Sequence, residues 1–126
     1  MSHSELIHAA PPRHRAFAGK RALVMGLGSF GGGAGAVRYL CELGARVVAT
    51  DKRAPQALAS TLAQLEGCTV EYVLGEHRVA DFEQSELVVV NPAVRRDDPL
   101  LAAARAAGAE FTSEIELFLE AVRARV

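Results

Sequence analysis

The stretch RALVMGLGSFGGGAG, from Arg21 to Gly35, decides the fold of this chain. It begins with a short aliphatic run that ends at a glycine, which is typical of a buried strand in a parallel sheet. Six glycines follow within ten residues, and Gly26, Gly28 and Gly31 match the pattern G-x-G-x-x-G. In that pattern a strand turns tightly into a helix whose free N–H groups can bind a phosphate. The stretch therefore predicts a strand, a phosphate-binding loop and a helix.

The rest of the chain alternates between helical and strand patterns. We expect strands over residues 45–51, 69–74, 86–90 and 109–112. We expect helices over residues 34–43, from 55 to a stop at 67, over 99–107 and over 114–124, with a short helix between 77 and 86. Ser113 and Glu116 form a capping box at the start of the last helix. This order predicts an α/β, Rossmann-like, doubly wound and mainly parallel five-stranded sheet with helices on both faces.

Length and composition fit one domain over residues 19–126, preceded by a flexible leader over 1–18. Fourteen Lys and Arg residues against 15 Asp and Glu give a net charge of −1, which provides no field for binding nucleic acid or an anionic membrane. No apolar run approaches ~20 residues, so we expect a soluble, cytoplasmic protein. Cys41 and Cys68 lack metal-ligand spacing, and we expect them to be small, buried or half-buried apolar residues in a reducing compartment.

Asp51 closes the second strand about 20 residues after the glycine loop, where a carboxylate can accept hydrogen bonds from a ribose hydroxyl. The glycine loop and Asp51 together indicate a nucleotide-binding site but do not identify the nucleotide. The alternative is that the glycines serve only the packing of the helix on the strand. Gly32, Gly33 and Gly35 are not explained by the pattern, because each costs a helix interior about 1 kcal/mol relative to alanine. Either ligand or backbone crowds the first helical turn, or that turn is loose.

Two further segments, DFEQSELVVVNPAV and SEIELF, are more specific than the glycine pattern. With GKRALVMGLGSFGGGAGAVRYLCELGARVVATD, they resemble the N-terminal domain of the Mur ligases, and within that family the branch that adds D-glutamate to UDP-N-acetylmuramoyl-L-alanine. The resemblance runs from about Gly19 to Leu119. It departs from the family pattern at Asn91 and Ala93, where the family usually carries Ser and Gly.

The resemblance implies that the domain holds the uridine-diphosphate end of the sugar nucleotide. By this resemblance the loop after the first strand faces the diphosphate, the segment after the second flanks the uridine, and the segment after the fourth closes over it. The residues concerned are, in that order, Gly28, Ser29, Phe30 and Gly31; Asp51, Lys52 and Arg53; and Asn91, Pro92 and Ala93.

The family's reaction is ATP-driven amide formation with bound Mg²⁺, which needs a P-loop in a central domain and an amino-acid site in a C-terminal domain. No G-x-x-x-x-G-K-[ST] occurs in this sequence. We therefore expect a substrate-binding lobe, either a fragment or a truncated gene product, that holds no cofactor or metal, partners the missing domains and is inactive alone.

Two other functions remain open. A small NAD- or NADP-binding module of a dehydrogenase or regulatory protein would share the loop and Asp51, but it leaves NPAV and SEIELF unexplained. A ligand-free interaction domain would use the last helix, on which we expect an exposed apolar face of Ile115, Phe118, Leu119 and Val122. His77 is interpreted as a solvated turn residue.

Overall fold

A computed structural model describes residues 17–27, 32–90, 94–95 and 97–124. Within these residues, strands and helices alternate along the chain as expected. The strands are β1 (Arg21–Met25), β2 (Arg46–Asp51), β3 (Val70–Leu74), β4 (Leu87–Val90) and β5 (Glu110–Ser113). The helices are α3 (Gly32–Glu42), the 3-10 turn η1 (Pro55–Leu58), α4 (Ala59–Gln64), α5 (Val79–Gln84), α6 (Pro99–Ala106) and α7 (Glu114–Ala124).

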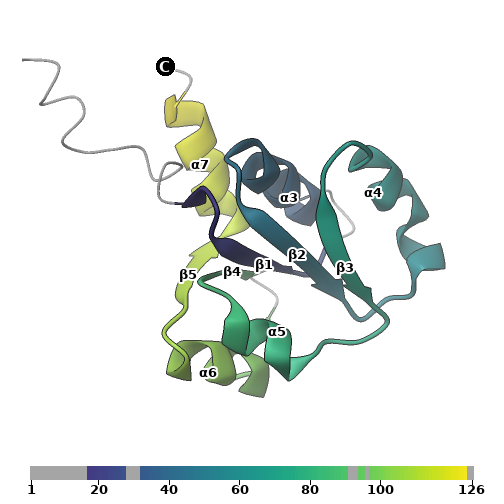
Figure 1. Cartoon of the computed structure of the whole chain (residues 1–126). Coiled ribbons are helices and arrows are strands. Elements are labelled where there is room, and N and C mark those ends of the chain that lie inside the picture. Colours follow the sequence, from purple (N-terminus) through teal and green to yellow (C-terminus); the bar gives the residue numbers. More distant parts are fainter. Residues whose placement is uncertain (1–16, 28–31, 91–93, 96, 125–126) are drawn as a thin grey trace, which may run out of the picture.

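The five strands form one sheet in the order β3-β2-β1-β4-β5, with every neighbouring pair parallel (Figure 1). β1 is central, and Val24 lies between Ala49 of β2 and Val89 of β4. The chain builds outward from β1 to β3 and then crosses to β4 on the other side of β1. This confirms the predicted doubly wound sheet and places its switch point between β1 and β4.

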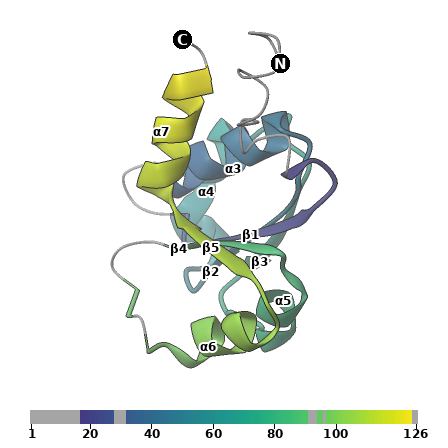
Figure 2. The ribbon, with the colours of Figure 1, turned by 90° about the vertical axis from the view of Figure 1, so that its left-hand side faces the viewer.

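Helices cover both faces of the sheet. α3, α4 and α7 lie on one face, and α5 and α6 lie on the other (Figures 1 and 2). Successive β1 side chains alternate between the two cores: Ala22 and Val24 pack with the first layer, Leu23 and Met25 with the second. Both layers therefore bury apolar side chains against β1, which is buried from Ala22 to Met25.

The ends of the elements differ from expectation in two informative places. α3 begins at Gly32, two residues earlier than predicted, so Gly32 and Gly33 start the helix instead of delaying it. Phe17, which lies within the expected leader, is 4% exposed and packs in the core. Residues 1–16 lie outside the described residues.

Side-chain caps fix the starts of the last two helices. Asp98 Oδ1 accepts a hydrogen bond from Leu100 N–H at 2.8 Å, and Ser113 Oγ accepts one from Glu116 N–H at 3.1 Å. The Glu116 carboxylate accepts the Thr112 hydroxyl at 2.9 Å, so only the serine half of the predicted capping box is seen.

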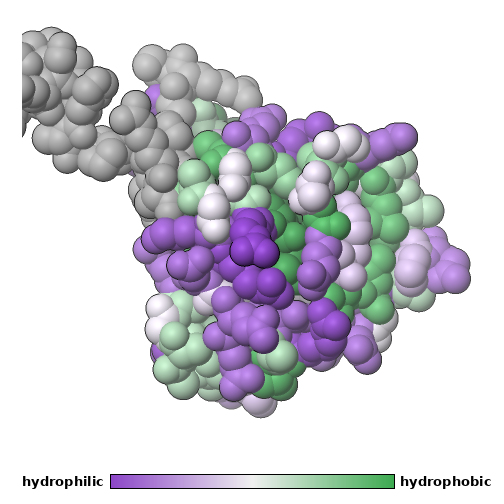
Figure 3. Space-filling view, in the orientation of Figure 1, coloured by the Kyte–Doolittle hydropathy of each residue, from purple (hydrophilic) through white to green (hydrophobic). Residues whose placement is uncertain are grey.

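Charged side chains tie the start of β1 to β3 and α5. Asp81 accepts from Arg78 Nε at 2.9 Å and lies 3.5 Å from Arg21 Nη2, while Arg78 Nη2 also reaches Glu71 at 3.3 Å. Hydrophilic residues gather on this side of the molecule over the start of β1 and over α5 (Figure 3). The cluster stabilises the edge where the strands begin. None of the helices in the described part of the chain has the length and apolar character needed to span a bilayer.

Candidate functional site

The predicted ligand segments all follow strands at the edge of the sheet where the strands end. Residues 28–31 follow β1, Lys52 and Arg53 follow β2, and residues 91–93 follow β4. Gly28, Ser29, Phe30, Gly31, Asn91, Pro92 and Ala93 lie outside the described residues. The described part of the site is therefore built from the end of β1, the first turn of α3, the end of β2 and the segment after β3.

The junction between β1 and α3 is a close contact of backbone on backbone. Gly26 has a φ of +89°, and its N–H donates to Thr50 O at 2.7 Å. A Cβ on Gly33 would lie 2.3 Å from Gly26 O and 2.6 Å from Leu27 Cα. Only a glycine fits at position 33, so Gly33 lets the N-terminus of α3 approach the end of β1. This contact explains why a glycine stands at position 33, which the sequence pattern left unexplained.

Gly35 does not share this constraint. A Cβ placed there meets no atom of the described residues within 4 Å, and the residue is exposed. No contact in the described structure requires a glycine at this position.

Asp51, 5% exposed, is the centre of the described site. Its Oδ2 accepts from Leu27 N–H at 2.9 Å, and its Oδ1 accepts from Arg53 N–H at 2.8 Å. The Arg53 guanidinium adds bonds from Nε at 3.2 Å and from Nη2 at 3.1 Å. A carboxylate offers about four lone-pair positions, so protein donors saturate Asp51.

Two opposed effects set the pKa of Asp51. Burial alone raises it, but hydrogen bonds from the Arg53 side chain and from the N–H groups of Arg53 and Leu27 together outweigh burial and hold the pKa below its usual range. Asp51 is thus an ionised clamp that joins the loop after β1 to the end of β2. It also orients Arg53, whose side chain is 39% exposed at this edge beside the exposed Lys52.

His77 is not the solvated turn residue that the sequence suggested. Its Nδ1 lies 2.7 Å from Thr50 Oγ1, and its ring meets the Phe82 ring edge-on at a centroid distance of 6.1 Å. Burial first, and then the positive charge of Lys52, lowers the pKa of His77, which favours the neutral imidazole at neutral pH. The prediction was wrong because Thr50 and Phe82 come from other elements.

Glu114 was overlooked by the sequence analysis. It opens α7 directly after β5, at the same edge of the sheet, and its Oε1 is buried without a hydrogen-bond partner in the described structure. Burial raises the pKa of Glu114. A buried oxygen left unpaired is costly, which makes Glu114 a candidate to accept a hydrogen bond from a ligand. Its place in SEIELF, one of the two segments that carry the family resemblance, was the available signal, but no role was expected for Glu114 itself.

The arrangement suits binding of an anion more than catalysis. The start of α3, where the positive end of the helix dipole lies, and the positive charges of Lys52 and Arg53 lie at one edge of the sheet. No group of three or more His, Cys, Asp or Glu side chains in the described part of the chain is arranged to hold a metal ion.

Comparison with known proteins identifies the family of this chain. The family model for the Mur ligase MurD-like N-terminal domain matches residues 20–113. The chain is 52% identical over 101 residues to a UDP-N-acetylmuramoylalanine--D-glutamate ligase of Roseiflexus sp. (strain RS-1), covering 80% of this chain and 22% of the relative. It is 46% identical over 98 residues to the ligase of the same name from Trichlorobacter lovleyi, covering 78% and 22%.

Solved structures show the same fold. A pseudomurein peptide ligase type C from Methanothermus fervidus superposes with a TM-score of 0.63 at 21% identity, over 80% of this chain and 20% of that one. The chain thus spans about a fifth of the length of the proteins it resembles.

Proposed function

This chain belongs to the Mur ligase family as a MurD-like N-terminal domain, and from that premise we propose that it binds the uridine-diphosphate end of UDP-N-acetylmuramoyl-L-alanine. The binding site is the edge where the strands of the sheet end. In the whole ligase, this binding would hold the substrate while D-glutamate is joined to it in an ATP- and Mg²⁺-dependent reaction. The sequence has no P-loop, so we assign those steps to other parts of the ligase.

The observation that carries this proposal is the junction of β1 and α3. It lies beside the switch point between β1 and β4, where open α/β sheets bind ligands. The close approach at Gly33 brings the N-terminus of α3 against the end of β1, so the start of the helix lies at the edge where β1 and β2 end. A diphosphate is the ligand group that such a helix start favours.

The bonding of Asp51 favours a uridine nucleotide over NAD. In dinucleotide-binding sites, the acid at the end of the second strand accepts a ribose hydroxyl. Here Leu27 and Arg53 supply the carboxylate with donors for its lone pairs. We therefore assign ligand contact in this segment to the cations Lys52 and Arg53, which Asp51 holds in position.

The apolar face of α7 supports the second part of the proposal, that other ligase domains pack against this one. Ile115, Phe118, Leu119 and Val122 are 44–66% exposed, whereas Leu117 on the inner face is buried. These exposed residues follow helical spacing and make a continuous stripe. We propose this stripe as the contact surface for the remainder of the ligase.

A parallel titration tests the ligand. The melting temperature of the chain is followed with UDP, UDP-N-acetylmuramoyl-L-alanine, NAD and NADP at equal concentrations up to tens of millimolar. A millimolar ligand at ten times its Kd stabilises the fold by about 1.4 kcal/mol, which is measurable. We expect the two uridine ligands to raise the melting temperature. Stabilisation by NAD or NADP without stabilisation by UDP would overturn the proposal.

Two lysines provide a matched pair of variants. Lys52 lies at the proposed edge, and Lys20 lies at the opposite edge, directly before β1. Both side chains are exposed, so Lys52→Gln and Lys20→Gln remove the same charge at little cost to the fold. We expect Lys52→Gln to weaken UDP binding several-fold and Lys20→Gln to leave it unchanged. Equal effects would show that net charge, not this site, governs binding.

A further inference from the structure

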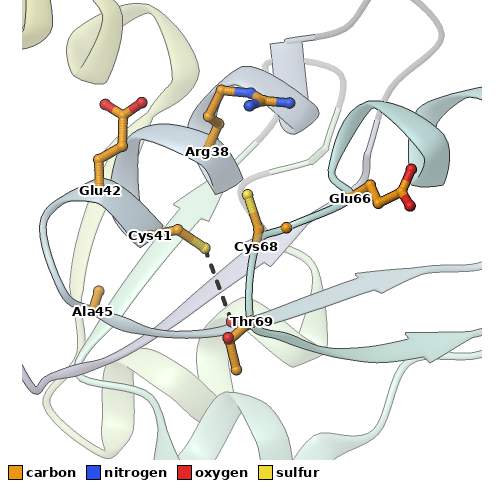
Figure 4. Close-up of a pocket in the computed structure, with 8 residues that line it drawn as sticks. Arg38, Cys41, Glu42, Ala45, Glu66, Cys68 and Thr69 are labelled. Atoms are coloured by element: carbon orange, nitrogen blue, oxygen red, sulfur yellow. Dashed lines mark hydrogen bonds between the residues drawn. The ribbon is translucent and has the colours of Figure 1, made fainter.

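A hollow of about 410 Å³ lies at the opposite edge of the sheet from the proposed nucleotide site. It is lined by the last turns of α3 and by the segment that leads into β3. Figure 4 shows Cys41 on α3 and Cys68 on that segment, with both sulfur atoms directed into the space between the two elements. The two cysteines are the unusual feature of this hollow, because they come from separate elements.

Contacts around the hollow bring the two thiols together. Cys41 Sγ lies 3.9 Å from the carbonyl oxygen of Thr69, the residue after Cys68. The side chains of Cys41 and Cys68 line the same hollow, and both cysteines are half-exposed. Tyr72 of β3 lies beside both thiols: burial first, and then these neighbours, raises its pKa. A reagent in solvent can therefore reach two thiols that line the same hollow.

The chain around Cys68 can accommodate a covalent bond. Cys68 lies between α4 and β3, outside regular structure, and follows Gly67, which has a φ of +93°. Cys41 lies one residue before the end of α3. A disulfide requires Cα atoms within about 7 Å, and the segment that carries Cys68 belongs to no helix or strand that would oppose an adjustment of its backbone.

We propose that Cys41 and Cys68 form a reversible disulfide by exchange with a small disulfide such as oxidised glutathione. In the first step the Cys68 thiolate attacks a sulfur of oxidised glutathione, forms a mixed disulfide and releases one glutathione thiolate. In the second step Cys41 loses its proton to water and attacks Cys68 Sγ, which releases the second glutathione thiolate. The protein loses two protons and two electrons, and one oxidised glutathione becomes two reduced ones.

The surroundings of Cys41 assign this order, because the carbonyl oxygen of Thr69, 3.9 Å from Cys41 Sγ, can accept a hydrogen bond from the thiol and so favours its protonated form. Burial first, and then the neighbouring Cys68, raises the pKa of Cys41 to about 11, while the nearby charge of Arg38 opposes this rise. Cys41 therefore stays protonated at neutral pH and is suited to the second step, after Cys68 has become a neutral mixed disulfide. Arg38 lines the hollow together with Glu42 and Glu66, so the lining carries charges of both signs and the exchange does not depend on the charge of the reagent.

The disulfide would join α3 to the start of β3 and close a loop of roughly 27 residues, which predicts a melting temperature higher by on the order of 10 °C. It would lie at the edge away from Asp51 and Lys52, so we expect UDP binding to be unchanged by oxidation. The proposal goes beyond the ligase function and does not depend on it.

The test equilibrates the 126-residue chain in glutathione buffers of increasing oxidised fraction, traps free thiols with an alkylating reagent and maps the peptides by mass spectrometry. We expect a peptide pair linked through Cys41 and Cys68, reversal by reduced glutathione and the rise in melting temperature. In Cys41→Ser we expect a mixed disulfide with glutathione on Cys68 and no such rise.

Three results would overturn the proposal. These are separate glutathione adducts on both cysteines of the wild-type chain, disulfide-linked dimers without the internal bond, or an unmodified chain at every buffer ratio. Cys68→Ser serves as the reciprocal control, and it must lose the internal cross-link as Cys41→Ser does. Circular dichroism of both variants before oxidation establishes that they are folded.

Discussion

Two aspartate–arginine pairs in this chain have almost the same contact distance and very different surroundings. Asp51 and Arg53 meet at 3.1 Å, and Asp97 and Arg95 meet at 3.0 Å; in each pair the partners are two residues apart. The Asp51 side chain is 7% exposed, whereas that of Asp97 is 71% exposed. Only Asp51 also accepts the N–H of a residue from another segment, Leu27. The comparison teaches that burial and additional donors, not distance, decide what such a pair contributes.

The two pairs also differ in what they connect. Asp51 joins the end of β2 to the turn after β1, so it fixes two strands of the proposed site relative to one another. Asp97 and Arg95 belong to the same connection between β4 and α6, and their bond joins nothing distant in the sequence. Changes at the first pair should therefore alter fold and site together.

The largest effect is expected from Gly33→Ala. This substitution disturbs the backbone that packs around the buried Asp51–Arg53 pair, and it changes neither residue of the pair. The added Cβ would overlap backbone atoms of Gly26 and Leu27 at 2.3–2.7 Å, so the turn that donates to Asp51 must move. We expect a loss of at least about 3 kcal/mol in the free energy of unfolding, measured by urea denaturation.

Gly35→Ala, in the same helix, is the matched control for Gly33→Ala. No described atom lies within 4 Å of its added Cβ, and alanine is the better helix former, so a gain of up to about 1 kcal/mol is expected. If both variants unfold at the same urea concentration as the wild type, the backbone of α3 does not pack against the end of β1 as closely as described for Gly33.

A smaller effect is expected from Asp51→Asn, which keeps the size of the side chain and removes its charge. Asparagine offers one acceptor oxygen in place of two and turns an NH₂ group toward donors, so some of the bonds from Leu27 and Arg53 are lost. We expect a destabilisation of about 1–3 kcal/mol at pH 7, measured by urea denaturation, together with weaker UDP binding because Arg53 is no longer oriented.

The pH dependence of this difference identifies its cause. The folded-state pKa of Asp51 lies below its unfolded value of about 3.9, so the ionised carboxylate stabilises the fold above that pH. This stabilisation is lost as pH falls through the folded pKa. The difference in the free energy of unfolding between the wild type and Asp51→Asn should have its full size near pH 7. It should shrink as the pH falls below about 4. A gap that stays constant with pH would assign the loss to shape instead of charge.

The sequence predicted the parts of this structure that depend on neighbours in the chain. The run from Arg21 to Gly35 predicted a strand, a turn and a helix, and the capping residue Ser113 lies where its helix starts. The position of Asp51 was also predicted, because the distance from the glycine loop to the end of the next strand is a local property.

Contacts between distant segments could not be predicted in the same way. The ribose-binding role expected for Asp51 did not account for Leu27 and Arg53, which fill its acceptor positions only once β1 and β2 are paired. Cys41 and Cys68 looked unrelated because nothing in their spacing indicates that α3 ends beside the segment before β3. Such contacts follow from the packing of helices on the sheet, which a pattern of apolar residues does not specify.

The smallest effect is expected from Asp97→Asn, which makes the same chemical change in the exposed pair. Arg95 is 83% exposed. After the change, water can therefore replace the Asp97 carboxylate as the hydrogen-bond partner of the Arg95 guanidinium at little cost in free energy. The free energy of unfolding should stay within about 0.5 kcal/mol of the wild-type value, at pH 7 and at pH 4 alike, in the urea experiment used for Asp51→Asn. Added salt should not widen this difference, because a pair open to solvent is already screened. A loss from Asp97→Asn as large as that from Asp51→Asn would mean that contact distance, not burial, governs the strength of both pairs.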